Sequence, residues 1–199
     1  MRFLSFPAIA IAAALFSGGA CAIAEPLDSP KSNSIDEEWH HFADRLTAVL
    51  GSLHEHEFLI LSEKKRNVYI QFASGGRAGL DVEAVSKQFF PDLSKEGKMN
   101  LDELGWSPPT YILGPNGEQV PGGSCNYSIH PDNMSSAALA DLVVRTFCLV
   151  YHTRHPADLQ YHSFRAPNTN IEFPALGLEW VPQPSASSKS SQPKPSPAQ

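Results

Sequence analysis

Basic residues are scarce in this sequence of 199 residues. Its 15 Lys and Arg stand against 21 Asp and Glu, which gives a formal net charge of −6. Binding to nucleic acid requires clustered positive charges that neutralise phosphates, and the sequence contains no such cluster. We therefore expect no nucleic-acid partner.

Sequence signatures of catalysis are also missing. There is no G-x-S-x-G elbow, no C-x-x-C pair and no glycine-rich phosphate loop. The sequence thus predicts a protein that is not an enzyme and needs no cofactor. Hydrophobic residues make up 42% of the chain, which is enough for one ordinary domain with a core.

Long hydrophobic runs are absent except at the N-terminus. Arg2 precedes an apolar run over residues 3–16, which is too short to span a bilayer comfortably. Small residues follow, and Ala22-Ile23-Ala24 fits the A-x-A pattern of signal-peptide cleavage. Residues 1–24 are therefore predicted to be a signal peptide, with Glu25 as the first mature residue and the protein secreted or periplasmic. A retained membrane anchor is the alternative.

Cysteine is nearly absent, with three residues in the chain. Cys21 would carry a lipid if the protein were a lipoprotein, but Gly18 stands where a lipobox usually has Leu, Val or Ile. Cleavage after residue 24 would leave Cys125 and Cys148, and an oxidising compartment favours a disulfide between them. Two buried thiols are the alternative.

Helical periodicity marks two long segments. Ser34-Ile35-Asp36-Glu37 matches a capping box, and apolar residues at helical spacing follow to about His54. Residues 132–151 show the same spacing. A shorter helix is expected over residues 93–104, stopped by Gly105.

Alternation with a period of two marks the strands between the helices. Residues 57–62, 68–73 and 80–84 form a predicted three-strand meander, in which Phe72 faces the core beneath the first helix. One or two later strands are expected, at residues 125–129 and in a hairpin over 111–120. The predicted class is α+β, an antiparallel sheet packed against N- and C-terminal helices.

The ends of the chain are expected to lie outside the domain. Residues 25–33 are predicted to be a linker, 34–165 the domain and 166–181 a C-terminal extension. From residue 182 to 199, Pro and Ser dominate and large apolar side chains are absent. Such a segment cannot offset its ordering entropy, so it is predicted to be disordered.

The sequence resembles a known superfamily. VYIQFA, the glycine-rich turn, LDVEAVS, LDELGW-x-PP and the later HPADL are similar to type III secretion chaperone-like proteins, and within them to TY-Chap peptide-binding domains. The resemblance covers residues 38–159. It implies a non-catalytic α/β module that binds a peptide or protein segment, and many members dimerise, so a homodimer is possible. Those chaperones act in the cytoplasm, whereas this chain carries an export signal.

The expected working surface is the sheet face that the helices leave uncovered. It would carry Tyr69, Gln71, Asp81 and Glu83, and an exposed strand edge is the alternative because a peptide can add to it as a further strand. Asp81 and Glu83 are spaced as an acid pair, but nothing in the sequence identifies a pocket or a second group that would separate their pKa values. A solvated face is the simpler interpretation of the two acids.

Histidines offer the main alternative chemistry. His54-x-His56 and His152-x-x-His155 have spacings that a metal could use, with His130 and His162 as further ligands. Surface histidines near helix ends are the simpler interpretation, so no metal site is predicted. A small metal-dependent or hydrolytic enzyme and a structural envelope protein remain the alternative functions.

The first testable prediction concerns the N-terminus. N-terminal sequencing of the protein isolated from its host should begin at Glu25, because residues 22–24 precede the expected cleavage site. A lipid on Cys21 would indicate the lipoprotein instead, and an intact Met1 would contradict export by either route.

Overall fold

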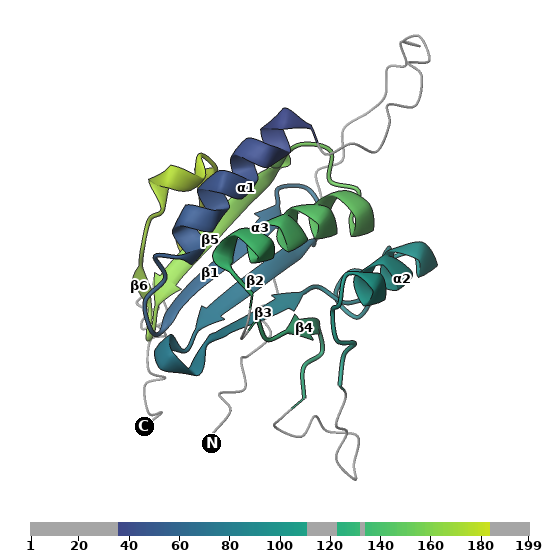
Figure 1. Cartoon of the computed structure of the whole chain (residues 1–199), viewed down its shortest axis with the longest axis horizontal. Helices are drawn as coiled ribbons and strands as arrows, with labels where there is room; N and C mark the ends of the chain where they lie inside the picture. Colours follow the sequence, from purple (N-terminus) through teal and green to yellow (C-terminus); the bar gives the residue numbers. More distant parts are fainter. Residues whose placement is uncertain (1–35, 111–122, 132–133, 184–199) are drawn as a thin grey trace, which may run out of the picture.

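Helices and a seven-stranded sheet form the described part of the chain (Figure 1). The computed structural model describes residues 36–110, 123–131 and 134–183. The α+β class predicted from the sequence is confirmed. The main elements in chain order are α1 (Glu37–Leu50), β1 (Glu57–Glu63), β2 (Tyr69–Ser74), β3 (Leu80–Ala84), α2 (Lys95–Glu103), β4 (Tyr127–Ile129), α3 (Ser136–Arg145), β5 (Leu159–Arg165), β6 (Thr169–Asn170) and β7 (Glu179–Trp180).

The strand order is β4-β3-β2-β1-β5-β6, and β7 pairs in parallel with β5. The predicted meander of β1, β2 and β3 is antiparallel as expected. The sequence indicated one or two later strands, whereas the described residues contain four. β5 pairs with β1 over seven residues, and residues 166–181 supply β6 and β7, which continue the sheet beyond β5.

The first helix begins two residues later than the capping-box pattern indicates. Asp36 is the N-cap, and its side chain accepts a hydrogen bond from the Trp39 backbone amide at 3.2 Å. Ser34 lies outside the described residues. The helix ends at Leu50 rather than near His54, and the chain then turns toward β1.

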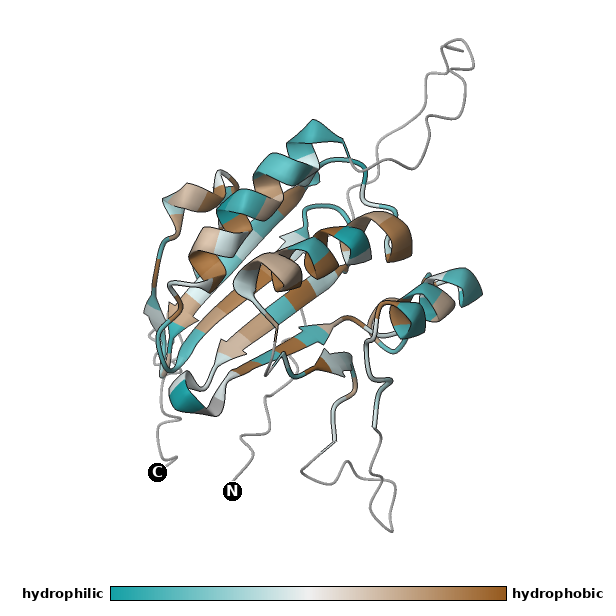
Figure 2. Ribbon diagram, viewed as in Figure 1, coloured by the Kyte–Doolittle hydropathy of each residue, from teal (hydrophilic) through white to brown (hydrophobic). Residues whose placement is uncertain are grey.

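The core lies between the helices and one face of the sheet. Figure 2 shows hydrophobic residues along the strands and along the helix sides that face them. From the strands, Leu59, Leu61, Ile70 and Phe72 are at most 1% exposed. The helices contribute a matching set of buried side chains: Trp39, Phe42, Leu46, Val49, Leu139, Val143 and Phe147.

The chain after α3 continues as a π-helical turn, η2 (Thr146–Val150). Thr146 Oγ donates to the Leu142 carbonyl at 2.7 Å and accepts from Trp106 Nε1 at 3.0 Å, which ties the α2–β4 connection to this turn. α2 packs directly against the turn at Gly97, where a Cβ atom would lie 3.1 Å from the Val150 carbonyl oxygen. The glycine therefore permits the close approach of the two elements.

Several expectations fall on residues that the structure does not describe. They are the signal peptide, the linker, the hairpin over residues 111–120 and most of the Pro- and Ser-rich tail. Within the described ranges, no helix is both long and apolar enough to cross a membrane. The helix predicted over residues 132–151 begins at Ser136, with Ser135 as its N-cap.

The burial of Phe72 gives a prediction for stability. Its side chain is 1% exposed, so Phe72→Ala should lower the free energy of unfolding by about 3–5 kcal/mol through lost burial and a cavity. Phe89→Ala, the same truncation at a half-buried site, is the matched control and should cost less. Equal denaturation midpoints for the two variants would contradict this account.

Candidate peptide-binding face

One face of the sheet carries none of the described helices, and we call it the open face. α1 and α3 lie side by side across the other face (Figure 1). Because side chains alternate along a strand, the residues between the core positions all point to the open face. The register arranges them in three rows that cross the strands: Gln160, Ser62 and Tyr69; His162, Ile60, Gln71, Glu83 and Ser128; and Phe164, Phe58, Ala73 and Asp81.

A polar network surrounds Glu83 on this face. Its carboxylate accepts hydrogen bonds from Gln71 Nε2 at 2.7 Å, Ser124 Oγ at 2.8 Å and Asn126 Nδ2 at 3.1 Å. The donors come from β2 and from the residues just before β4, so the network fixes three neighbouring segments. All three donors are neutral groups. Within the described ranges, no lysine or arginine forms an ion pair with Glu83.

Tyr69, which is also on β2, belongs to the same network. Its hydroxyl lies 3.2 Å from Asn126 Nδ2. Burial raises the pKa of the Tyr69 hydroxyl, and the hydrogen bond with Asn126 only partly offsets this effect. The phenol consequently remains neutral at physiological pH and serves as a polar contact rather than as a base.

Asp81 and Glu83 do not form the acid pair that their spacing suggested. Asp81 lies 2.8 Å from His130 Nδ1, and its side chain is 60% exposed. Glu83 is half-buried within its own set of donors. The two carboxylates thus have different partners, and no described contact links them.

Aromatic side chains occupy the other half of the open face. Phe58 of β1 and Phe164 of β5 stack with ring centroids 4.8 Å apart and an interplanar angle of 11°. Both rings are half-buried, and Ile60 and His162 stand next to them in the adjacent row. This half offers apolar surface to a partner, while the half on β3 offers hydrogen-bonding groups and negative charge.

Ser62 is the least satisfied polar residue on this face. It is 4% exposed, and its hydroxyl oxygen has no hydrogen-bond partner among the described residues. It stands between Tyr69 and Gln160 in the first row. Buried polar atoms usually have a partner, and this hydroxyl is an exception within the β1–β5 part of the face.

Short segments pair with the outer strands, so the described edges of the sheet are formed by residues 107–110 beside β4 and by β6 and β7 beside β5. Along β4, Ser107 and Ser128 exchange two backbone hydrogen bonds of 2.8 and 2.9 Å. Along β5, the amides of Ile171 and Val181 donate to the carbonyls of Ser163 and Tyr161. The described edges therefore leave few backbone groups to which a peptide could add as a further strand. Of the two expected surfaces, the geometry favours the face.

Sequence reasoning placed Tyr69, Gln71, Asp81 and Glu83 on one face, and the structure brings all four there. It missed the aromatic half and Asn126. β5 has alternating polarity (LQYHSFR), a signal that would have identified it as a strand. Asn126 belongs to the network because β4 pairs with β3, a long-range contact that alternation does not reveal.

The histidines are spread over the described structure instead of converging. His56 lies near Glu55 at 3.8 Å and His155 near Glu38 at 3.5 Å. The ring of His155 also accepts a hydrogen bond from the Ala157 amide. No three His, Cys, Asp or Glu side chains within the described ranges are placed to hold a metal ion, so the histidine spacings gain no support as a metal site.

The predicted disulfide is absent. Cys125 and Cys148 are not joined. Cys148 lies in η2, which follows α3 in the helical layer, whereas Cys125 lies just before the short strand β4, which pairs with β3. Burial raises the pKa of the Cys148 thiol to about 12, so it remains protonated and packs as a small apolar group.

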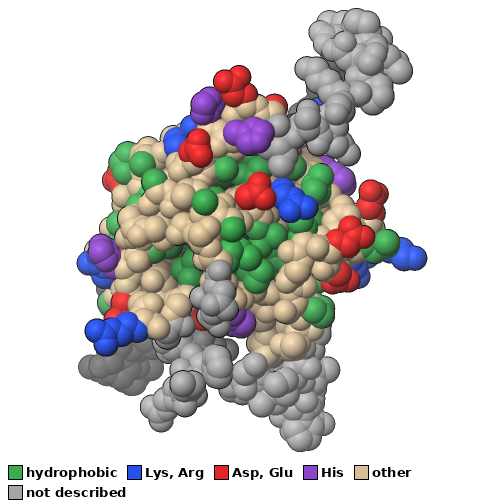
Figure 3. Space-filling view, in the orientation of Figure 1, with side chains coloured by type: hydrophobic (Ala, Val, Ile, Leu, Met, Phe, Trp, Pro, Cys, Tyr) green, Lys and Arg blue, Asp and Glu red, His purple; other side chains and the backbone are tan. Residues whose placement is uncertain are grey.

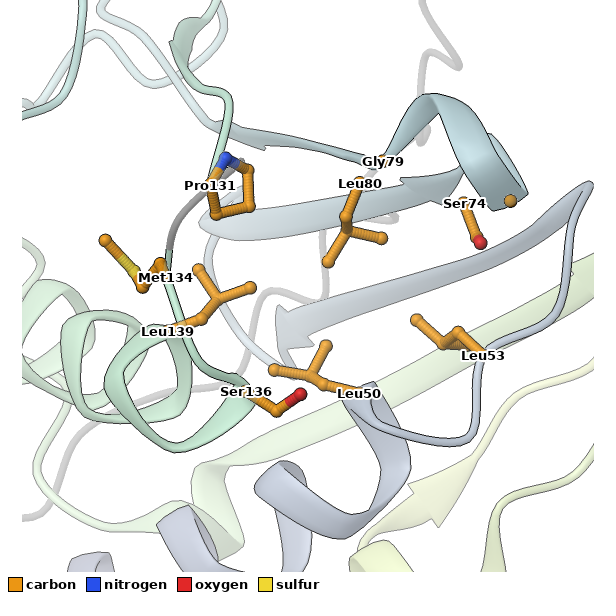
Figure 4. A pocket seen from close by; sticks show the side chains of 10 residues that line it. Leu50, Leu53, Ser74, Gly79, Leu80, Pro131, Met134, Ser136 and Leu139 are labelled. Atoms are coloured by element: carbon orange, nitrogen blue, oxygen red, sulfur yellow. The ribbon is translucent and has the colours of Figure 1, made fainter.

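A small pocket opens at one end of the helical layer (Figure 4). It has a volume of about 220 Å³ and lies between the end of α1, the start of α3 and the turn from β2 to β3. Its apolar lining comes mainly from Leu50, Leu53, Leu80, Met134 and Leu139. Figure 3 shows hydrophobic side chains gathered near the centre of this helix-bearing side, with charged ones around its margin.

Comparison with known proteins gives a match to one protein family. The model of TY-Chap3, described as T3SS (YopN, CesT) and YbjN peptide-binding chaperone 3, matches residues 32–165. That range contains every strand from β1 to β5. No curated protein and no solved structure matches the chain. The resemblance inferred from the sequence is thus confirmed at the level of the family.

The environment of His162 predicts a pH dependence of stability. Burial lowers the pKa of His162 below 6.5, and a hydrogen bond with the Val181 backbone only partly offsets this. The unfolded chain then binds a proton more readily, so this contribution to stability is complete above pH 6.5 and is lost as the pH falls below it.

His162→Gln should therefore reduce the loss of stability between pH 7 and about pH 5, measured as urea midpoints. His41→Gln is the control, because its ring is 63% exposed. An unchanged pH profile for His162→Gln, with both variants folded, would show that His162 does not control this loss.

Proposed function

The chain belongs to the TY-Chap3 family of peptide-binding chaperones, and on this premise we propose that it binds a protein or peptide segment on the open face. The observation that carries the proposal is the combination of uncovered face and covered edges. The face presents half-buried aromatic rings beside a fixed polar network, while backbone pairing along both sides of the sheet is already used. The segment would be held mainly through side-chain contacts.

The proposal involves no chemical reaction. Ser124 follows two glycines, a position in which a nucleophile on a turn could stand. Its hydroxyl donates a hydrogen bond to the Glu83 carboxylate and accepts one from the Asn126 backbone amide at 3.0 Å. These bonds give the serine a role in holding the segment before β4. Glu83 in turn is engaged by three neutral donors. Both residues therefore contribute to the shape of the binding face.

We also propose that the protein acts after export, in the periplasm or outside the cell. The support is the apolar N-terminal run and the Ala22-Ile23-Ala24 pattern. A homodimer is compatible with the proposal if its contact surface leaves the open face accessible.

The proposed function can be tested with an array of short extended peptides of varied sequence. The full-length protein should bind a subset of them, and Phe164→Ala should weaken that binding roughly tenfold or more, because aromatic side chains in binding surfaces commonly contribute the largest energies. Phe164→Leu should lose less, because it keeps most of the apolar area.

Two matched variants separate the open face from other apolar surfaces. Met99→Ala removes a side chain that is 54% exposed on α2, and Leu53→Ala enlarges the pocket of the helical layer. Neither should alter peptide binding, with folding verified by thermal denaturation. Binding that depends on Leu53 and not on Phe164 would move the site to the pocket, and the absence of any bound peptide would contradict the proposed function.

A further inference from the structure

The charges on the open face are nearly all negative. Asp81 and Glu83 stand next to each other in the second and third rows, and no Lys or Arg belongs to any of the three rows. Lys64, at the far margin near β7, is matched by Glu179 at 3.2 Å. The described surface therefore presents two carboxylates at β3 that no described lysine or arginine pairs with.

The two acids differ from the buried carboxylates elsewhere in the fold. Glu57 and Glu63, which are 2% and 8% exposed, each form an ion pair with an arginine. Among the described residues, Glu83 has only neutral partners, and Asp81 has only a histidine. A cation brought by a partner would thus find carboxylates that no lysine or arginine already neutralises.

Apolar surface lies two strands away from these acids. Phe58 of β1 and Asp81 of β3 belong to one row, and neighbouring strands are about 4.8 Å apart, so the two positions are separated by roughly 10 Å. An extended segment advances about 3.3 Å per residue, which makes that distance roughly three residues. Side chains on the same side of an extended segment are two or four residues apart. A long Lys or Arg side chain is flexible enough to cover the difference between these spacings and the distance of about three residues.

We propose that the open face selects segments in which a large apolar side chain lies two or four residues from a lysine or arginine, and that it disfavours acidic segments. The apolar side chain packs on the Phe58–Phe164 pair while the basic group lies over Asp81 and Glu83. This inference rests on the proposed function, because it specifies the partner of the same face.

Four fluorescein-labelled peptides of equal length test the selection. Each has a Ser- and Gly-rich background: one carries Leu and Arg four residues apart, and the others replace Arg by Gln, Arg by Glu, or Leu by Ser. Fluorescence anisotropy with the full-length protein should rank the Leu–Arg peptide first and the Leu–Glu peptide last. The advantage of Arg over Gln should be roughly two- to fivefold and should shrink at high salt, because exposed charges are screened.

Substitutions at Asp81 assign the effect to the face. Asp81→Asn should weaken the Leu–Arg peptide and leave the Leu–Gln peptide unchanged, and Asp81→Lys should shift the preference toward the Leu–Glu peptide, a reversal that loss of structure would not produce. Asp141→Asn, at an exposed position on α3, is the matched control and should change nothing.

The outcomes separate the two proposals. If none of the four peptides binds and the array gives no bound peptide, the proposed function fails. If Leu–Arg, Leu–Gln and Leu–Glu bind equally and Asp81→Lys changes nothing, the function stands and the charge selection is wrong. Sedimentation provides one further check: a dimer that Asp81→Lys dissociates would show that a second copy occupies the face, which would overturn the selection of a basic segment.

Discussion

The pairing of β5 with β1 is the interaction on which both faces of the sheet depend. It extends over seven residues and joins segments about one hundred positions apart in the chain. On the core side it places Tyr161 beside Leu61, beneath the helical layer. On the open face it places Phe164 beside Phe58 and His162 beside Ile60. Without this register the aromatic half of the candidate binding surface would not exist.

The ends of β1 show how the fold treats buried charge. Burial alone would raise the pKa of Glu57, but the His54 amide and the Arg165 guanidinium outweigh it and lower that pKa. At the other end, Glu63 pairs with Arg66, and this hydrogen bond raises the pKa of Arg66. Because buried ions need partners, these pairs fix the strand's ends in the sheet. The carboxylates of β3 have no arginine partner in the part of the chain that the structure describes, which gives the open face its own electrostatic character.

Backbone pairing along the outer strands explains where a partner can dock. Segments that contribute little to the core, such as residues 107–110 and the short strands β6 and β7, cover the outer strands. They satisfy amides and carbonyls that would otherwise pair with other chains. The surface that remains is a sheet face, where specificity depends on side chains and not on backbone addition.

The sequence alone determined the meander, the short helix that ends before Gly105, and the face shared by Tyr69, Gln71, Asp81 and Glu83. These features depend on spacing between residues close in the chain, since a period of two assigns alternate side chains to opposite faces wherever the strand lies. The resemblance carried by VYIQFA and LDELGW also sufficed to identify the family, which the match over residues 32–165 confirms.

Tertiary structure alone decided the neighbours of those residues. Asn126 and Ser124 reach Glu83 because β4 pairs with β3, and Phe164 reaches Phe58 because β5 pairs with β1. The same long-range placement puts Cys148 in the helical layer and Cys125 beside the sheet, so the disulfide inferred from their even number is not formed. Alternation within a strand carries no information about which distant strand lies beside it, and this is why contacts between strands had to come from the folded chain.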